Sequence, residues 1–169
     1  MKNLKNVILN AGMIIAGILM YVFMACATFT PKGLPGEESV NLFDFMKKGV
    51  QESNQFMSAT GLNLAVVAGY FIAIFAAIMI VVAIVNLLCN LGVIKNAKVA
   101  KILNIVNMVV SIVIAIAAIL VVVGMGSYVS ANKMGGYAKI GWAAIVNLIV
   151  GVLAAACGVL GFVWGKKSK

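Results

Sequence analysis

The chain has 169 residues, of which 64% are hydrophobic and only 10% are charged, and its formal net charge is +9. Soluble domains carry roughly 45 to 50% apolar and about 25% charged residues, so this composition excludes an ordinary soluble domain and indicates a protein embedded in lipid. The positive charge does not indicate a nucleic-acid partner, because it is dispersed over separate segments, without arginine and without interleaved aromatic residues.

Four uncharged apolar runs are long enough to cross a bilayer, which takes about 20 helical residues. They cover residues 6–29, 61–94, 102–127 and 140–165. None of them alternates polar and apolar residues as a membrane β-strand does. The sequence therefore predicts an all-α integral membrane protein with one membrane domain, a bundle of four transmembrane helices.

The first run also has features of a secretory signal, since Lys2 and Lys5 precede it and small residues at 25–27 form a possible cleavage site. However, it is longer than the usual signal core and contains Asn10, Gly12 and Gly17. A retained helix is therefore favoured over a cleaved signal, and cleavage would leave the other three spans oriented as before.

The lysines predict the orientation of the chain, because positive residues in short loops stay on the cytoplasmic side. All four acids fall between the first and second spans, in residues 37–52. Both termini are therefore expected in the cytoplasm, with the protein in the cytoplasmic membrane and the 30–60 loop outside. Eight of the 13 lysines lie on the side predicted to be cytoplasmic: Lys2, Lys5, Lys95, Lys98, Lys101, Lys166, Lys167 and Lys169.

The second run is over-long, because a helix over residues 61–94 would measure about 51 Å against a hydrocarbon core of about 30 Å. Its outer third, residues 61–70, is expected to project from the membrane and to need an apolar cover. The first outer loop offers one, since residues 40–58 predict an amphipathic helix with Ser39 or Asn41 as its N-cap. Its apolar face would comprise Leu42, Phe43, Met46, Val50 and Met57.

Two series of small residues predict close helix contacts, because helices in lipid associate through tight packing and interhelical hydrogen bonds. The fourth span carries small residues four apart that end with Gly161 and Gly165. The series in the second span consists of Ala65, Gly69, Ala73 and Ala77. Either series could close the monomer or join two protomers.

Asparagines near the predicted cytoplasmic boundary form a polar layer, within about 14 Å of the neighbouring lysines along each helix. The favoured hypothesis is that their carboxamides bond across helices and fix helix rotation. The alternative is a cytoplasm-facing vestibule of a channel or carrier. The layer consists of Asn10, Asn86, Asn90, Asn104 and Asn107, with Asn6 one turn from Asn10.

Trp142 and Trp164 are predicted to be interfacial anchors, because about 33 Å of helix separates them and tryptophan is enriched at both membrane surfaces.

Intramembrane chemistry has few candidate groups here, since the chain has no histidine and no acid or lysine within a predicted span. Cys26, Cys89 and Cys157 lie at different predicted depths, which argues against a disulfide framework. The sequence therefore favours a non-enzymatic protein without metal or cofactor. The leading hypothesis is a scaffold or accessory subunit that contacts lipid and either a second copy or another membrane protein; the alternative is a passive channel or small-solute carrier.

The order of these features, with a short tail, a larger first outer loop, a tight basic inner link and a lysine-rich end, resembles that of small uncharacterised four-pass membrane proteins of bacteria with AT-rich genomes. This resemblance of layout covers the whole chain. The layout is also similar to tetraspan and claudin-like architectures, although the paired outer-loop cysteines typical of both are missing from this sequence.

Overall fold

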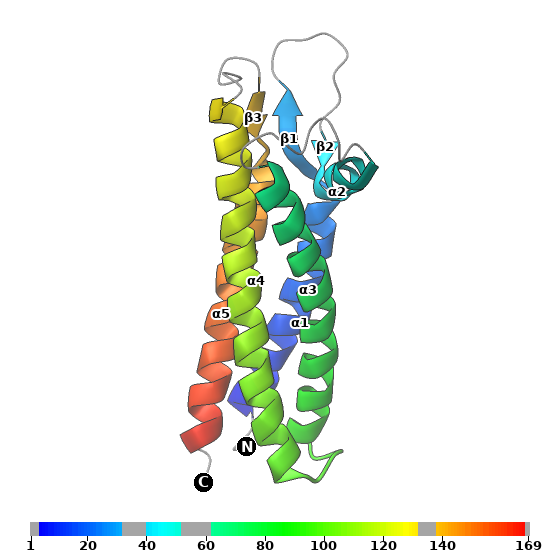
Figure 1. Cartoon of the computed structure of the whole chain (residues 1–169). Helices are drawn as coiled ribbons and strands as arrows, with labels where there is room; N and C mark the ends of the chain where they lie inside the picture. The colour runs from blue at the N-terminus through cyan, green and yellow to red at the C-terminus, as the bar shows by residue number, and fades with distance from the viewer. Residues whose placement is uncertain (1–3, 32–39, 52–61, 132–137, 168–169) are drawn as a thin grey trace.

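Four long antiparallel helices form the body of the protein (Figure 1). The computed structural model describes residues 4–31, 40–51, 62–131 and 138–167. Each long helix contains a segment long and apolar enough to cross a membrane, so the prediction of four such helices is confirmed. The helices are α1 (Leu4–Met24), α3 (Leu62–Asn90), α4 (Ala97–Ala131) and α5 (Trp142–Lys167).

The four helices close into a ring, because α1 and α4 each pack against both α3 and α5. The two chain ends and the α3–α4 turn lie at the same end of the bundle (Figure 1). We call this the lysine end, because Lys5, Lys95, Lys98 and Lys101 are found there. The opposite end carries a small sheet and a short helix, which together we call the cap.

The sheet of the cap consists of β1 (Ala27–Pro31), β2 (Val40–Asn41) and β3 (Ala138–Ile140), in the antiparallel order β2-β1-β3. The prediction of an all-α fold missed this sheet. The strands contain the β-branched residues Thr28, Thr30, Val40 and Ile140, which favour extended backbone. Pairing between segments far apart in the sequence satisfies the backbone hydrogen bonds of these strands. The sheet also ends the first helix at Met24 rather than at the predicted residue 29.

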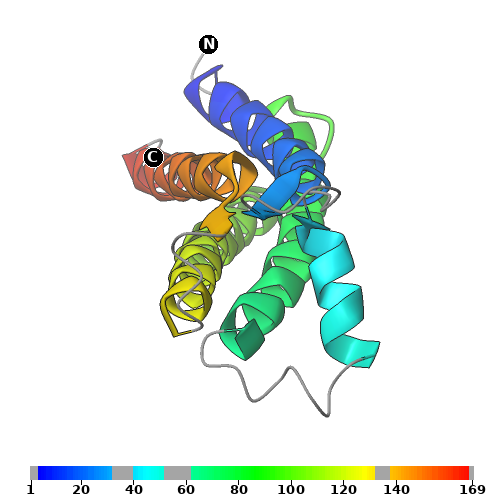
Figure 2. The same cartoon turned by 90° about the horizontal axis from the view of Figure 1, so that it is seen from above.

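The short helix of the cap is α2 (Leu42–Gln51), which packs along α3 (Figure 2). Its N-cap is Asn41, whose Oδ1 accepts the Asp44 N–H at 2.8 Å while its Nδ2 donates to the Asp44 carboxylate at 2.6 Å. The amphipathic helix predicted over 40–58 is therefore helical from Leu42, and residues 52–58 lie outside the described ranges.

Helix α3 ends at Asn90 because the chain turns at Gly92, which has a φ of 83°. Glycine adopts this backbone conformation without strain because it has no Cβ. Val93 N–H donates to the Leu88 carbonyl at 3.0 Å and Gly92 N–H to the Cys89 carbonyl at 3.2 Å, which is the Schellman pattern of helix termination. The predicted end at residue 94 was therefore too late.

Helix α4 begins earlier than predicted, because the Asn96 Oδ1 accepts the N–H groups of Lys98 and Val99 at 3.1 and 3.3 Å. It continues to Ala131 and has 35 residues, whereas α3 has 29. Among the described helices α4 is thus the longest, which the sequence did not predict, and α3 is shorter than the predicted range 61–94. At about 43 Å, α3 still exceeds the thickness of a bilayer core.

The bundle interior is rich in methionines and small residues, while many of the large branched side chains point outward. Met20, Met79 and Met125 are fully buried, and Ile15, Val81 and Leu153 are more than half exposed. Flexible methionine side chains fill irregular gaps between helices, here beside Gly17 and Gly151. The protein therefore presents an apolar exterior.

Candidate functional site

At the lysine end, three buried asparagines meet from three different helices. The Asn10 Oδ1 of α1 accepts hydrogen bonds from the Asn86 Nδ2 of α3 and the Asn107 Nδ2 of α4, each at 3.1 Å. These three side chains are at most 3% exposed, so water does not compete for the bonds. The carboxamides thus set the rotation and depth of α1, α3 and α4 relative to one another.

Two half-buried asparagines extend this network at its edge. Asn86 Nδ2 also donates to the Asn104 Oδ1 at 2.6 Å, and Asn90 Nδ2 donates to the Asn86 carbonyl at 2.8 Å. Asn10 Nδ2 in turn donates to the Asn6 carbonyl at 2.7 Å. The structure therefore joins all five asparagines of the sequence-predicted layer, which we call the asparagine network, and leaves the buried Oδ1 atoms of Asn6 and Asn107 without a hydrogen-bond partner among the described residues.

The glycines of α5 let α4 and α1 approach beside this network. A Cβ on Gly165 would lie 2.6 Å from the Asn104 Nδ2, and one on Gly158 would collide with the Ser111 hydroxyl and lie 3.1 Å from the Asn107 carbonyl. Gly161 has more room, because a Cβ there would lie 3.9 Å from the Leu9 side chain of α1. The small-residue face of α5 is therefore occupied by contacts within the chain.

The small residues of α3 do not share one partner. Ala65 is fully buried, and Gly69 is covered by α2, because a Cβ there would lie 3.0 Å from the Met46 sulfur. The Ala73 carbonyl accepts a hydrogen bond from the Tyr21 hydroxyl of α1. Ala77 is exposed on the outer face of α3. The four residues thus form contacts with different elements instead of one continuous seam.

The two tryptophans lie at opposite ends of α5. Trp142 is 55% exposed and packs edge-on against Phe23, with ring centroids 5.9 Å apart. Trp164 lies at the lysine end, where the Lys5 ammonium is 5.3 Å from its ring centroid. This separation and exposure suit residues at two membrane surfaces.

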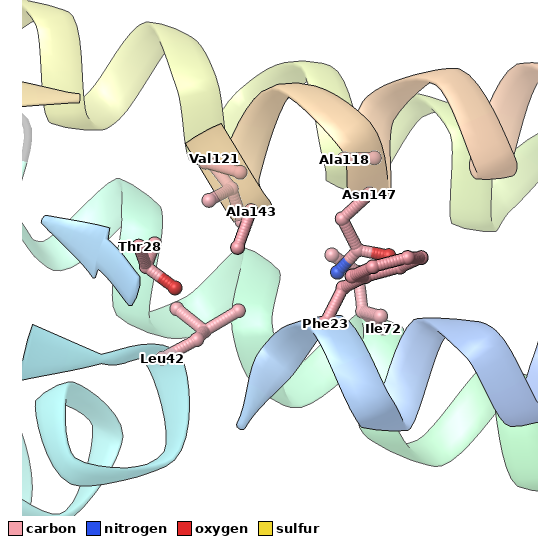
Figure 3. Close-up of a pocket in the computed structure, with 9 residues that line it drawn as sticks. Phe23, Thr28, Leu42, Ile72, Ala118, Val121, Ala143 and Asn147 are labelled. Carbon is pink, nitrogen blue, oxygen red and sulfur yellow. The ribbon is translucent and has the colours of Figure 1, made fainter. Parts of the chain in front are cut away.

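Beneath the cap lies a small cavity to which every helix and β1 contribute a wall (Figure 3). Asn147 of α5 is 5% exposed, and its Oδ1 has no hydrogen-bond partner among the described residues. Figure 3 shows its carboxamide beside the Phe23 ring, with the Thr28 hydroxyl on the side toward the cap. The lining comprises Phe23, Thr28, Leu42, Ile72, Ala118, Val121, Ala143, Ala144 and Asn147.

Sequence reasoning missed the roles of Tyr21 and Asn147. An isolated asparagine in an otherwise apolar span was the available signal for Asn147, whereas nothing in the sequence pairs Tyr21 with Ala73. All three cysteines lie in the described ranges, and each is a free thiol. Comparison of the chain with known protein families, with characterised proteins and with solved structures finds no match.

Proposed function

We propose that this chain is a multi-pass protein of a bacterial cytoplasmic membrane, with both termini and the α3–α4 turn in the cytoplasm. The apolar exterior and the buried asparagines support insertion into lipid, because in a bilayer polar groups are satisfied inside the bundle. The lysines at one end support the orientation. The cap, with α2 and the sheet, then lies outside the cell.

Cysteine labelling tests this topology in a variant that lacks Cys26, Cys89 and Cys157. We expect an impermeant thiol reagent added to intact cells to label Lys139→Cys next to the cap and to leave Lys98→Cys unlabelled until the membrane is opened. Both positions are exposed in the protein, so protection reports the membrane rather than the fold. Labelling of Lys98→Cys alone in intact cells would show that the orientation is the reverse of the one proposed.

The protein acts in this proposal as a non-enzymatic scaffold or accessory subunit that associates with a second copy or another membrane protein. The supporting observation is Ala77, the one member of the α3 series left exposed, between the exposed side chains Ile74 and Val81. A small residue between larger ones lets a partner helix approach its backbone closely. Elsewhere in both series, contacts within the chain use the small residues.

Disulfide cross-linking in native membranes tests this association. In the cysteine-free variant, we expect Ala77→Cys to form a dimer or a mixed disulfide with a partner under mild oxidation. Ile15 lies on the outer face of α1 and is 57% exposed, so Ile15→Cys is the matched control. We expect Ile15→Cys to react much more slowly. Equal yields at both positions, or a monomer that binds nothing, would argue against the scaffold.

The competing function is a passive channel or carrier, for which the observation is the asparagine network itself, a buried polar region inside an apolar bundle. Solute flux into liposomes that carry the purified protein tests it. Flux that Asn86→Leu abolishes while the fold is retained would favour the channel. The hydrogen bonds that join the carboxamides to one another favour the structural role instead.

A further inference from the structure

The cavity beneath the cap combines two features that together point to a ligand. The space in it that the centre of a water molecule can occupy is about 10 Å³, which is close to the minimum for holding one water molecule. One wall is the Asn147 carboxamide, which is 95% buried and whose Oδ1 accepts no hydrogen bond from the described residues. An amide oxygen buried without a partner is unfavourable, because it loses its hydrogen bonds to water and gains none in the protein.

The second polar wall of the cavity is Thr28, which is 2% exposed. Its hydroxyl donates to the Cys26 carbonyl at 3.3 Å, so the lone pairs of Oγ1 stay available as acceptors. The other lining groups, such as Leu42, Ile72 and Val121, are apolar. The cavity therefore offers hydrogen-bonding groups to a very small polar molecule and has no room for a larger one.

We propose that this cavity is a hydration site, in which a buried water molecule binds the Asn147 carboxamide and lies between α5 and the Thr28 strand of the cap. A water molecule both donates and accepts, so it satisfies an acceptor that no group of the described residues reaches. The site differs from the asparagine network, where the carboxamides of different helices bond to one another.

The test is direct detection of the water by NMR. The full chain, labelled with ¹⁵N-asparagine, is studied in deuterated detergent, and the spectrum of Asn147→Leu identifies the Asn147 side-chain signals by their loss. We expect a cross-relaxation peak at the water frequency, with the sign of a long-lived bound water, at Asn147. Asn86 is the matched control, because its Nδ2 already donates to Asn10 and Asn104, and we expect it to show no such peak.

Filling the cavity separates bound water from simple proton exchange. Ala143 is fully buried and its methyl points toward Thr28 and Leu42 (Figure 3), so Ala143→Val should displace the water and remove the peak. Val121→Ile is a second filling variant, used if Ala143→Val does not fold. Absence of the peak in the natural chain, or its persistence in a folded filling variant, would overturn the proposal. A crystal structure with an ordered water within about 3.2 Å of the carboxamide would support it.

Discussion

At the lysine end, Asn10, Asn86 and Asn107 approach one another from three helices, whereas at the capped end Asn147 enters the bundle alone. All four side chains are at most 5% exposed. The same residue type therefore has two outcomes inside one apolar bundle. Where other helices supply carboxamides at the same depth, a buried carboxamide bonds to them, although the Oδ1 of Asn107 still has no partner among the described residues. Where they do not, the packing leaves a small cavity beside the carboxamide.

The two ends also differ in how the backbone is held. At the lysine end, Gly158 lets α5 lie against the Asn107 backbone of α4. At the capped end, Gly141 N–H donates to the Thr28 carbonyl at 2.6 Å, which fixes the start of α5 to the sheet. Substitutions that alter one end and leave the other intact test this comparison. Each change in stability is measured by thermal unfolding in mild detergent.

The largest effect is expected from Gly141→Ala. A Cβ at this position would collide with the Ala27 carbonyl, which is backbone and has little freedom to move, so we expect a loss of about 3 kcal/mol. Gly126→Ala is the control, because its Cβ would meet Ile140 at an ordinary 3.7 Å. A helical Gly→Ala change of that kind should be neutral or stabilising. Equal losses of stability in the two variants would show that the backbone contact at Gly141 does not require glycine.

A somewhat smaller loss, about 2 to 3 kcal/mol, is expected from Gly158→Ala at the lysine end. The added methyl would press on the Ser111 hydroxyl and on the Asn107 backbone. Gly161→Ala, three residues further along the same helix, has 3.9 Å to its nearest neighbour and should not destabilise the protein. If both substitutions are tolerated, α4 and α5 are not in close backbone contact.

The comparison of the asparagines is tested by Asn86→Leu against Asn147→Leu. Asn86 donates to two carboxamides and accepts from a third, so its loss should cost about 2 kcal/mol. Asn147 makes no hydrogen bond to a described side chain, and its replacement should change stability by less than about 1 kcal/mol. A larger loss at Asn147 would show that the two ends do not differ in the way proposed.

The smallest effect is expected where a flexible side chain covers a glycine. Gly69→Leu should cost about 1.5 kcal/mol, because the nearest atoms belong to the end of the Met46 side chain of α2, which can move aside. Ala77→Leu, on the exposed face of the same helix, should change the stability of the monomer by less than about 0.5 kcal/mol but lower the oligomer yield. Equal destabilisation by both substitutions would indicate that the small residues form one continuous packing seam along α3.

Much of the candidate site could be predicted because its signals are local. The spacing of Asn6 and Asn10 and of Asn86 and Asn90, each one helical turn apart, placed the carboxamides on single faces near the lysines. The cap was harder to predict, since β1 pairs with a strand more than 100 residues away in sequence. Its short strands carry no periodic pattern that separates them from a loop.

The sequence by itself determined four apolar helices, the polar layer and the amphipathic character of the segment after Val40, because helix length, hydrophobicity and face are properties of neighbouring residues. Only the tertiary structure decided which asparagines bond and that Asn147 lies beside a cavity, whereas the cover that α2 gives Gly69 agrees with the expectation from the sequence. Those outcomes depend on the mutual rotation and depth of helices. They are set by packing among residues far apart in the chain, which no local pattern encodes.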